Sequence, residues 1–137
     1  MTLVSEAMDR APATIGADAP ASQASVVARE ADADHLLVVD EGALVGVLCG
    51  CDLDAVTPGE PVWERMTVPV LTVRPDASVE EAALTMSDCR VGCLPVVIGG
   101  LVMGIVTGDD LRRAGASVPE DRRRCHHHRA QRSLDHS

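Results

Sequence analysis

The chain contains no lysine, phenylalanine or tyrosine, and Trp63 is its only aromatic residue. Apolar residues still make up 46% of the 137 residues, so a core must be built from Val, Leu, Ala, Met and Ile. The sequence also lacks an apolar run of about 18 residues and a charged-then-apolar leader at its amino end. We therefore expect a soluble, cytoplasmic protein that does not enter a membrane.

Charge is distributed unevenly along the chain. Residues 1–111 hold 18 acidic residues and five arginines, a net charge of −13, whereas residues 112–137 hold three acidic residues and seven arginines, a net charge of +4. The acidic part argues against nucleic acid as a partner, because neutralising phosphates requires a basic face. Blocks of like charge are usually solvated, so we predict that residues 116–137 form a disordered Arg- and His-rich tail.

Cysteine and histidine residues give only weak indications of metal or redox chemistry. Five cysteines without a secretion signal do not indicate a disulfide framework. His35, Cys49 and Cys51 could provide three zinc ligands, but a CxxC pair is missing and buried cysteine often acts as a small apolar residue. We expect no metal site and no cofactor, and keep a thiol redox or metal-responsive protein as an alternative. Further candidates for metal or redox chemistry are the pair Cys89 and Cys93 and the Cys-His-His-His tract at 125–128.

The strongest pattern in the sequence is an internal repeat. A shift of 58 residues aligns residues 4–53 with 62–111 without a gap, and 15 of the 50 pairs are identical. The matched pairs include glycines and aspartates, among them Asp52 with Asp110. Such a match indicates that one structural unit has been duplicated. We therefore divide the chain into a first repeat at 1–58, a second repeat at 59–115 and the tail at 116–137.

Each repeat is predicted to have the element order β-α-β-β-α. In the second repeat a short strand ends near Val73, and the Ser-x-x-Glu spacing from Ser78 predicts a helix over 79–87. Two apolar runs separated by two glycines then predict a β-hairpin, and a last helix begins near Gly108. One unit of about 50 residues buries little core by itself. We therefore predict an α+β fold of two such units packed sheet to sheet with pseudo-two-fold symmetry. The first repeat has the matching helix at 21–30, strands at 36–39 and 44–48, and a helix from Gly50.

Two motifs in the second repeat resemble those of CBS (cystathionine beta-synthase) domains. Residues 104–111, GIVTGDDL, are similar to the closing signature Gly-apolar-apolar-Thr/Ser-x-x-Asp-apolar. Residues 90–97, RVGCLPVV, are similar to the Leu-Pro-Val-Val strand of the family. Together with the duplication, the resemblance covers residues 3–115 and suggests a tandem CBS pair, also called a Bateman module. It implies a non-catalytic regulatory module that binds an adenosine-containing nucleotide of the AMP, ADP or ATP class. It also implies a homodimer, and a signal passed to an unidentified effector protein or through the oligomeric state.

Thr107 and Asp110 are the main candidate nucleotide-binding residues. Thr107 is predicted where a strand ends and a helix begins, so its hydroxyl can donate to a phosphate. Asp110 returns to the same side of the helix about one turn later, where its carboxylate can accept both ribose hydroxyls. The alternative is that the two residues only cap the helix and favour its positive end. The resemblance adds five residues that match the lining of the base slot, for which ordinary core packing is the alternative: Leu71, Thr72, Val91, Gly92 and Cys93.

The first repeat departs from the family pattern. It keeps Asp52 but has Cys49 where Thr or Ser is expected, and a thiol is a weak hydrogen-bond donor. Asp34 replaces a glycine and adds negative charge near any bound phosphate. We therefore predict one good site in the second repeat and a weaker, empty or altered site in the first. A ligand-free dimerisation module is the second alternative function. The sequence contains no catalytic motif, so we name no catalytic residue and expect no enzyme.

Overall fold

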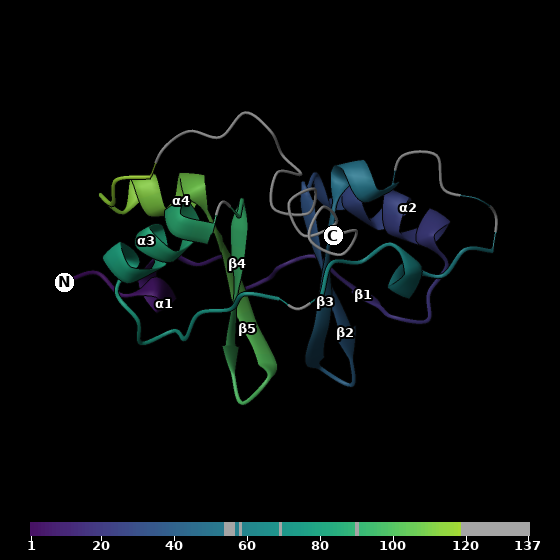
Figure 1. Ribbon diagram of the computed structural model, residues 1–137, viewed down its shortest axis with the longest axis horizontal. Coiled ribbons are helices and arrows are strands. Elements are labelled where there is room, and N and C mark those ends of the chain that lie inside the picture. The colour runs from purple at the N-terminus through teal and green to yellow at the C-terminus, as the bar shows by residue number, and fades with distance from the viewer. Residues whose placement is uncertain (54–56, 58, 69, 90, 119–137) are drawn as a thin grey trace. The chain divides into compact units, whose positions relative to one another are not determined.

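The computed structural model describes residues 1–53, 57, 59–68, 70–89 and 91–118, without the side chain of Cys51. The chain forms two compact units (Figure 1). One unit is Pro12–Val70, which we call the first-repeat unit. The other combines Met1–Ala11 with Leu71–Ser137, and we call it the second-repeat unit. The spatial units therefore differ from the sequence repeats, because residues 1–11 of the first repeat belong to the second-repeat unit.

The described residues of the first-repeat unit form three strands and one α-helix. Strand β1 runs parallel to β2, and β2 runs antiparallel to β3. Helix α2 packs against the strands, with Ala24 facing Leu36, Val38 and Leu48 in one apolar cluster. The unit also contains two short 3₁₀ helices, η1 and η2. The bounds are β1 Thr14–Gly16, α2 Ala21–Ala31, β2 His35–Asp40, β3 Ala43–Cys49, η1 Gly50–Leu53 and η2 Val62–Glu64.

In the part of the second-repeat unit that the structure describes, the helices α1, α3 and α4 lie on one side of a β-hairpin (Figure 1). The strands β4 and β5 pair antiparallel, and Val73 forms a single parallel bridge to Val96 of β4. The buried residues of α3 lie on one helical face, as the apolar spacing predicts. They pack against Leu94 of β4 and Val106 of β5. The bounds are α1 Val4–Ala7, α3 Val79–Cys89, β4 Cys93–Ile98, β5 Leu101–Thr107 and α4 Gly108–Arg113.

The predicted start of the helix in the second repeat is confirmed by its cap. The Ser78 hydroxyl accepts a hydrogen bond from the Glu81 amide at 3.1 Å, which satisfies one of the amides that a helix start leaves without an intrahelical partner. Helix α3 ends at Cys89, two residues beyond the predicted end.

No helix among the described residues is long and apolar enough to cross a membrane.

The two hairpins repeat one another in register. His35 pairs with Cys49 in the first hairpin, and Cys93 pairs with Thr107 at the positions 58 residues later. Both hairpins also carry an irregularity at the same place, after Val38 and after Val96. The duplication and the mixed α+β class predicted from the sequence are therefore confirmed. One element differs in the described residues, because Gly50–Leu53, where the last helix of the first repeat is predicted to begin, form the 3₁₀ helix η1.

The first residues of each sequence repeat pack with the main part of the other repeat, so residues 1–11 belong to the second-repeat unit and the start of the second repeat belongs to the first-repeat unit. Met8 lies over Gly104 of the second-repeat unit, and Met66 lies over Gly46 of the first-repeat unit. Backbone hydrogen bonds fix the first of these contacts, since Asp9 and Ile105 exchange amide-to-carbonyl bonds of 2.9 and 3.0 Å. Glycine is required where the segment crosses β5, because a side chain at 104 would fill the same space.

The fold of the second-repeat unit continues past residue 115. Ala116 is buried in the core cluster, and its amide donates to the Leu111 carbonyl at 2.9 Å. The Val118 carbonyl accepts a hydrogen bond from Arg112 at 3.2 Å. The predicted tail at 116–137 therefore begins too early, because Ala116 fills the core. Residues 119–137 lie outside the described residues.

Shortening the chain tests where the folded unit ends. We expect truncation after Val118 to leave the melting temperature unchanged. Truncation after Gly115 should destabilise the protein by about 1 kcal/mol, because it removes buried apolar groups of Ala116 and Val118 from the core. Thermal unfolding of the two truncated proteins beside the full chain measures the difference. Equal melting temperatures for both truncations would contradict the role given to Ala116.

Candidate functional site

The end of β5 and the start of α4 bring Thr107 and Asp110 together. Thr107 is the N-cap of α4, and its hydroxyl oxygen accepts a hydrogen bond from the Asp110 amide at 3.3 Å. In return, Oδ2 of Asp110 accepts from the Thr107 amide at 2.9 Å and from the Thr107 hydroxyl at 3.1 Å. This is a capping box, so the capping alternative describes the chain as it stands without a ligand. The same geometry places a hydroxyl and a carboxylate side by side.

Two arginines of α4 lie beside this pair, and sequence reasoning did not single them out. Arg113 forms an ion pair with Oδ1 of Asp110, and Arg112 forms one with Oδ1 of Asp109 at 2.5 Å. The hydrogen bond from Arg112 lowers the pKa of the Asp109 carboxyl, and its positive charge adds to the effect. Both pairs have the i,i+3 spacing that joins neighbours on a helix surface, and this spacing could have identified them. Each carboxylate of the turn thus has a cation beside it.

Three of the predicted base-slot residues lie at the same end of the hairpin as Thr107. Cys93 is the first residue of β4 and the cross-strand partner of Thr107. Its side chain is buried, while Val91 and Gly92 just before it are half-buried. The Val91 amide donates to the Met86 carbonyl at 3.2 Å, which fixes the turn between α3 and β4. Their role in holding a base stays a prediction.

Leu71 and Thr72, the other two predicted base-slot residues, are exposed. They lead into the parallel bridge in which the Val73 amide donates to the Pro95 carbonyl at 3.0 Å. Because the bridge is parallel, Leu71 and Thr72, which precede Val73, lie toward the end of β4 at which Cys93 begins the strand. Leu71 is 40% exposed, so it is not packed in the core.

The matching turn of the first repeat keeps the carboxylate but has no hydroxyl. The Cys49 amide donates to Oδ2 of Asp52 at 2.7 Å, the counterpart of the bond between Thr107 and Asp110. Asp52 is buried, with 2% of its surface exposed, whereas Asp110 is half-buried. The carboxylate of the first repeat is therefore less accessible to a ligand.

Asp34 lies just before β2, at the same turn of the first repeat. Its backbone carbonyl accepts a hydrogen bond from the Gly50 amide at 3.0 Å, and Gly50 follows Cys49 directly. The residue is exposed. Asp34 therefore lies beside the altered motif, and its effect on a bound phosphate stays a prediction.

The hypothesised metal and thiol sites gain no support from the described residues. Among these residues, no three His, Cys, Asp or Glu side chains are grouped as metal ligands would be. Cys89 is exposed at the end of α3 and Cys93 is buried in β4, so the two thiols have different environments. The Cys51 side chain and the tract at 125–128 lie outside the described residues.

Comparison with known proteins identifies the family of the chain. The family model of the CBS domain matches residues 4–56 and again residues 62–117. The chain belongs to the CBS domain family. The two matches coincide with the duplicated segments, so the sequence contains two CBS domains in tandem.

Curated proteins also match most of this chain. An L-aspartate semialdehyde sulfurtransferase of Methanocaldococcus jannaschii is 31% identical over 117 residues, which are 82% of this chain and 23% of that enzyme. The chain thus spans about a quarter of the length of that curated relative.

Solved structures of CBS pairs resemble this chain over most of its length. The CBS pair of protein MJ0100, solved with 5′-methylthioadenosine and S-adenosyl-L-methionine, is 30% identical, with a TM-score of 0.77 over 84% of this chain and 96% of that one. The protein CBSX2, solved with AMP, is 27% identical, with a TM-score of 0.78 over 84% and 96%. A second solved structure is that of CBSX2 from Arabidopsis thaliana.

Proposed function

We propose that this chain is a non-catalytic regulatory module whose second repeat binds an adenosine-containing ligand. Asp110 would accept the ribose hydroxyls and Thr107 would donate to a phosphate. The base would lie along the segment from Val91 to Cys93, with Leu71 and Thr72 on its other side. The module would report the bound ligand through a homodimer or a separate effector protein.

The contact between the Thr107 hydroxyl and the Asp110 carboxylate carries this proposal. The two groups lie 3.1 Å apart at the end of β5, and the Asp110 side chain is 12% exposed. A carboxylate accepts hydrogen bonds from a diol, and a hydroxyl donates to a phosphate oxygen, so the pair suits adjacent parts of a nucleotide. The related CBS pairs solved with AMP, 5′-methylthioadenosine and S-adenosyl-L-methionine support an adenosine-containing ligand.

A thermal-shift panel tests the proposed function. The panel comprises AMP, ADP, ATP, NAD and S-adenosylmethionine. A ligand present at 100 times its dissociation constant should stabilise the fold by about 2.7 kcal/mol. Guanosine 5′-monophosphate at the same concentration serves as the control for unspecific anion binding. No shift with any adenosine compound would favour the ligand-free interaction module.

Restoring the hydroxyl in the first repeat should strengthen its site. Cys49→Thr recreates Thr-x-x-Asp with Asp52, and a hydrogen bond to a charged group contributes about 1.5–3 kcal/mol. We expect about a tenfold gain in affinity at that site. Adding Asp34→Gly should increase the gain, because it removes a like charge from the position of the phosphate.

Calorimetry measures this change as binding stoichiometry and affinity. The control is Asp34→Gly alone, which removes the charge without adding the hydroxyl. If the double variant still binds one ligand per chain, the first site is closed by the burial of Asp52 and not by the chemistry of residue 49.

A further inference from the structure

The hydrogen-bonding capacity of Asp110 is nearly filled before any ligand binds. A carboxylate has about four acceptor positions on its two oxygens. The amide and the hydroxyl of Thr107 both donate to Oδ2, and Arg113 binds Oδ1. One acceptor position therefore remains, whereas a ribose diol needs two. A ligand that places its ribose on Asp110 must displace one of the present donors.

The Thr107 hydroxyl and Arg113 are the donors that can move. The Thr107 amide is fixed because it belongs to the backbone of the helix cap. The hydroxyl can rotate away from Oδ2, and the Arg113 side chain is 74% exposed, so solvent lies around most of it. Surface ion pairs of this kind contribute little to stability, and their side chains rearrange readily.

When Arg113 leaves Asp110, it loses an ion pair, and its position decides which ligands can offer a new acceptor in place of the carboxylate. Its guanidinium and the Thr107 hydroxyl bind opposite oxygens of one carboxylate. A phosphate that accepts from the Thr107 hydroxyl therefore comes within reach of Arg113, which can donate two parallel hydrogen bonds to phosphate oxygens. A thioether offers no such acceptor, and a sulfonium group carries positive charge that repels the guanidinium.

We propose that Arg113 transfers from Asp110 to the 5′-phosphate of the ligand and makes the second repeat select adenosine 5′-phosphates over adenosyl thioethers. This inference rests on the proposed function of the second repeat, and it names the ligand class of that site. The first repeat has Ala55 at the equivalent sequence position.

The test compares AMP with 5′-methylthioadenosine, which differ at the 5′ position, by calorimetry. Arg113→Gln should weaken AMP binding about tenfold, because a charged donor to the phosphate is lost. Binding of 5′-methylthioadenosine should stay equal or become up to about threefold tighter, because its ribose no longer competes with Arg113 for Asp110. Arg113→Lys should keep part of the preference for AMP, because it retains the charge but not the paired donors.

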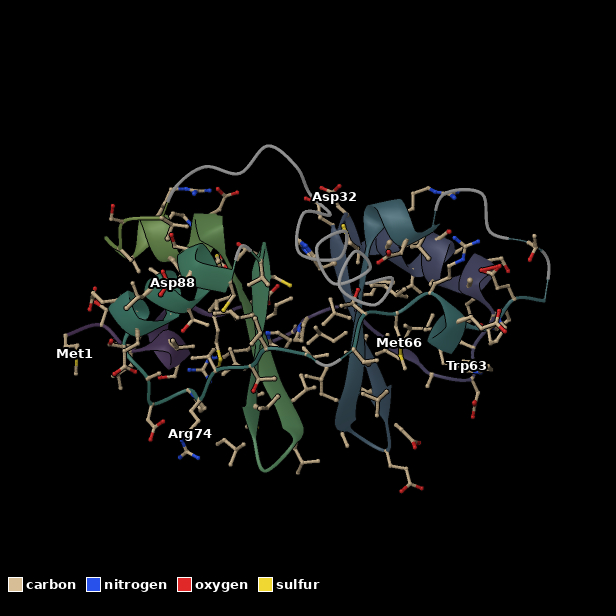
Figure 2. The ribbon with its side chains drawn as sticks, viewed as in Figure 1. Met1, Asp32, Trp63, Met66, Arg74 and Asp88 are labelled. Atoms are coloured by element: carbon tan, nitrogen blue, oxygen red, sulfur yellow. The ribbon has the colours of Figure 1, made fainter. Side chains whose placement is uncertain are left out.

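The control variant is Arg74→Gln. Arg74 forms an exposed ion pair with Asp76 at 3.0 Å in the same unit and extends from its surface (Figure 2). The variant removes the same charge, and the ratio of the two affinities should not change. An unchanged ratio in Arg113→Gln, with both ligands bound by the unmodified chain, would overturn the inference and leave the proposed function standing. Failure of both ligands to bind the unmodified chain would overturn the proposed function together with the inference.

Discussion

Asp110→Ala should weaken AMP binding about 100-fold, whereas Asp52→Ala should weaken it less than threefold. The loss at Asp110 corresponds to about 2.7 kcal/mol, which is the size expected for one or two hydrogen bonds from the ribose to a charged acceptor. Asp52 lies beside Cys49, which offers no hydroxyl for a phosphate, and it is buried. Calorimetry on both variants measures the two losses.

The free energy of unfolding should fall more in Asp52→Ala than in Asp110→Ala, which is the opposite of the order expected for AMP binding. Asp52→Ala leaves the buried Cys49 amide without its 2.7 Å acceptor, which costs about 1–3 kcal/mol. Asp110→Ala removes one partner of a half-exposed cap and should cost about 1 kcal/mol. Asp110→Asn is the matched control, since it can still accept from the Thr107 amide but loses the charge. A larger loss of AMP binding in Asp52→Ala than in Asp110→Ala would reverse the ranking of the two sites.

The elements of each unit could be predicted because their signals are local. The serine before α3 and the glycines between β4 and β5 mark boundaries within a few residues of sequence. The duplication adds a second copy of the same signals, and the strand pairs of the two hairpins correspond under the same shift of 58 residues. The closeness of Thr107 and Asp110 follows in the same way from a spacing of three residues at a helix start.

The remaining features depend on contacts between distant segments. Nothing in the local pattern of residues 4–8 shows that they pack with α3 and α4, because residues such as Val79 and Leu111 lie far along the sequence. Ala116 follows a charged helix, so its burial is also invisible in the sequence. The ion pair between Arg113 and Asp110 is a side-chain contact, and the family motif ends before it.

Gly104→Ala should destabilise the second-repeat unit by about 3 kcal/mol and lower the melting temperature by about 10 °C. A Cβ at this position would lie 2.6 Å from the Asp9 carbonyl oxygen and 2.8 Å from the Met8 sulfur. The Asp9 backbone cannot move aside without breaking both of its hydrogen bonds to Ile105. The variant therefore has to loosen the leading segment of the chain from β5.

Two other glycines of the chain provide matched controls. At Gly46 a Cβ would lie 2.5 Å from the Met66 sulfur and 2.8 Å from its Cγ, two atoms that a change of the Met66 rotamer can move, whereas the Met66 Cβ at 3.0 Å is fixed by the backbone. Gly46→Ala should therefore cost less, about 1–2 kcal/mol. At Gly16 no atom lies within 4 Å of the added carbon, so Gly16→Ala should be neutral or stabilise by up to about 1 kcal/mol. Thermal unfolding of the three variants measures this order. If Gly104→Ala and Gly16→Ala have the same melting temperature, residues 8 and 9 are not held against β5. The packing of the first residues of the chain on the second-repeat unit would then be wrong.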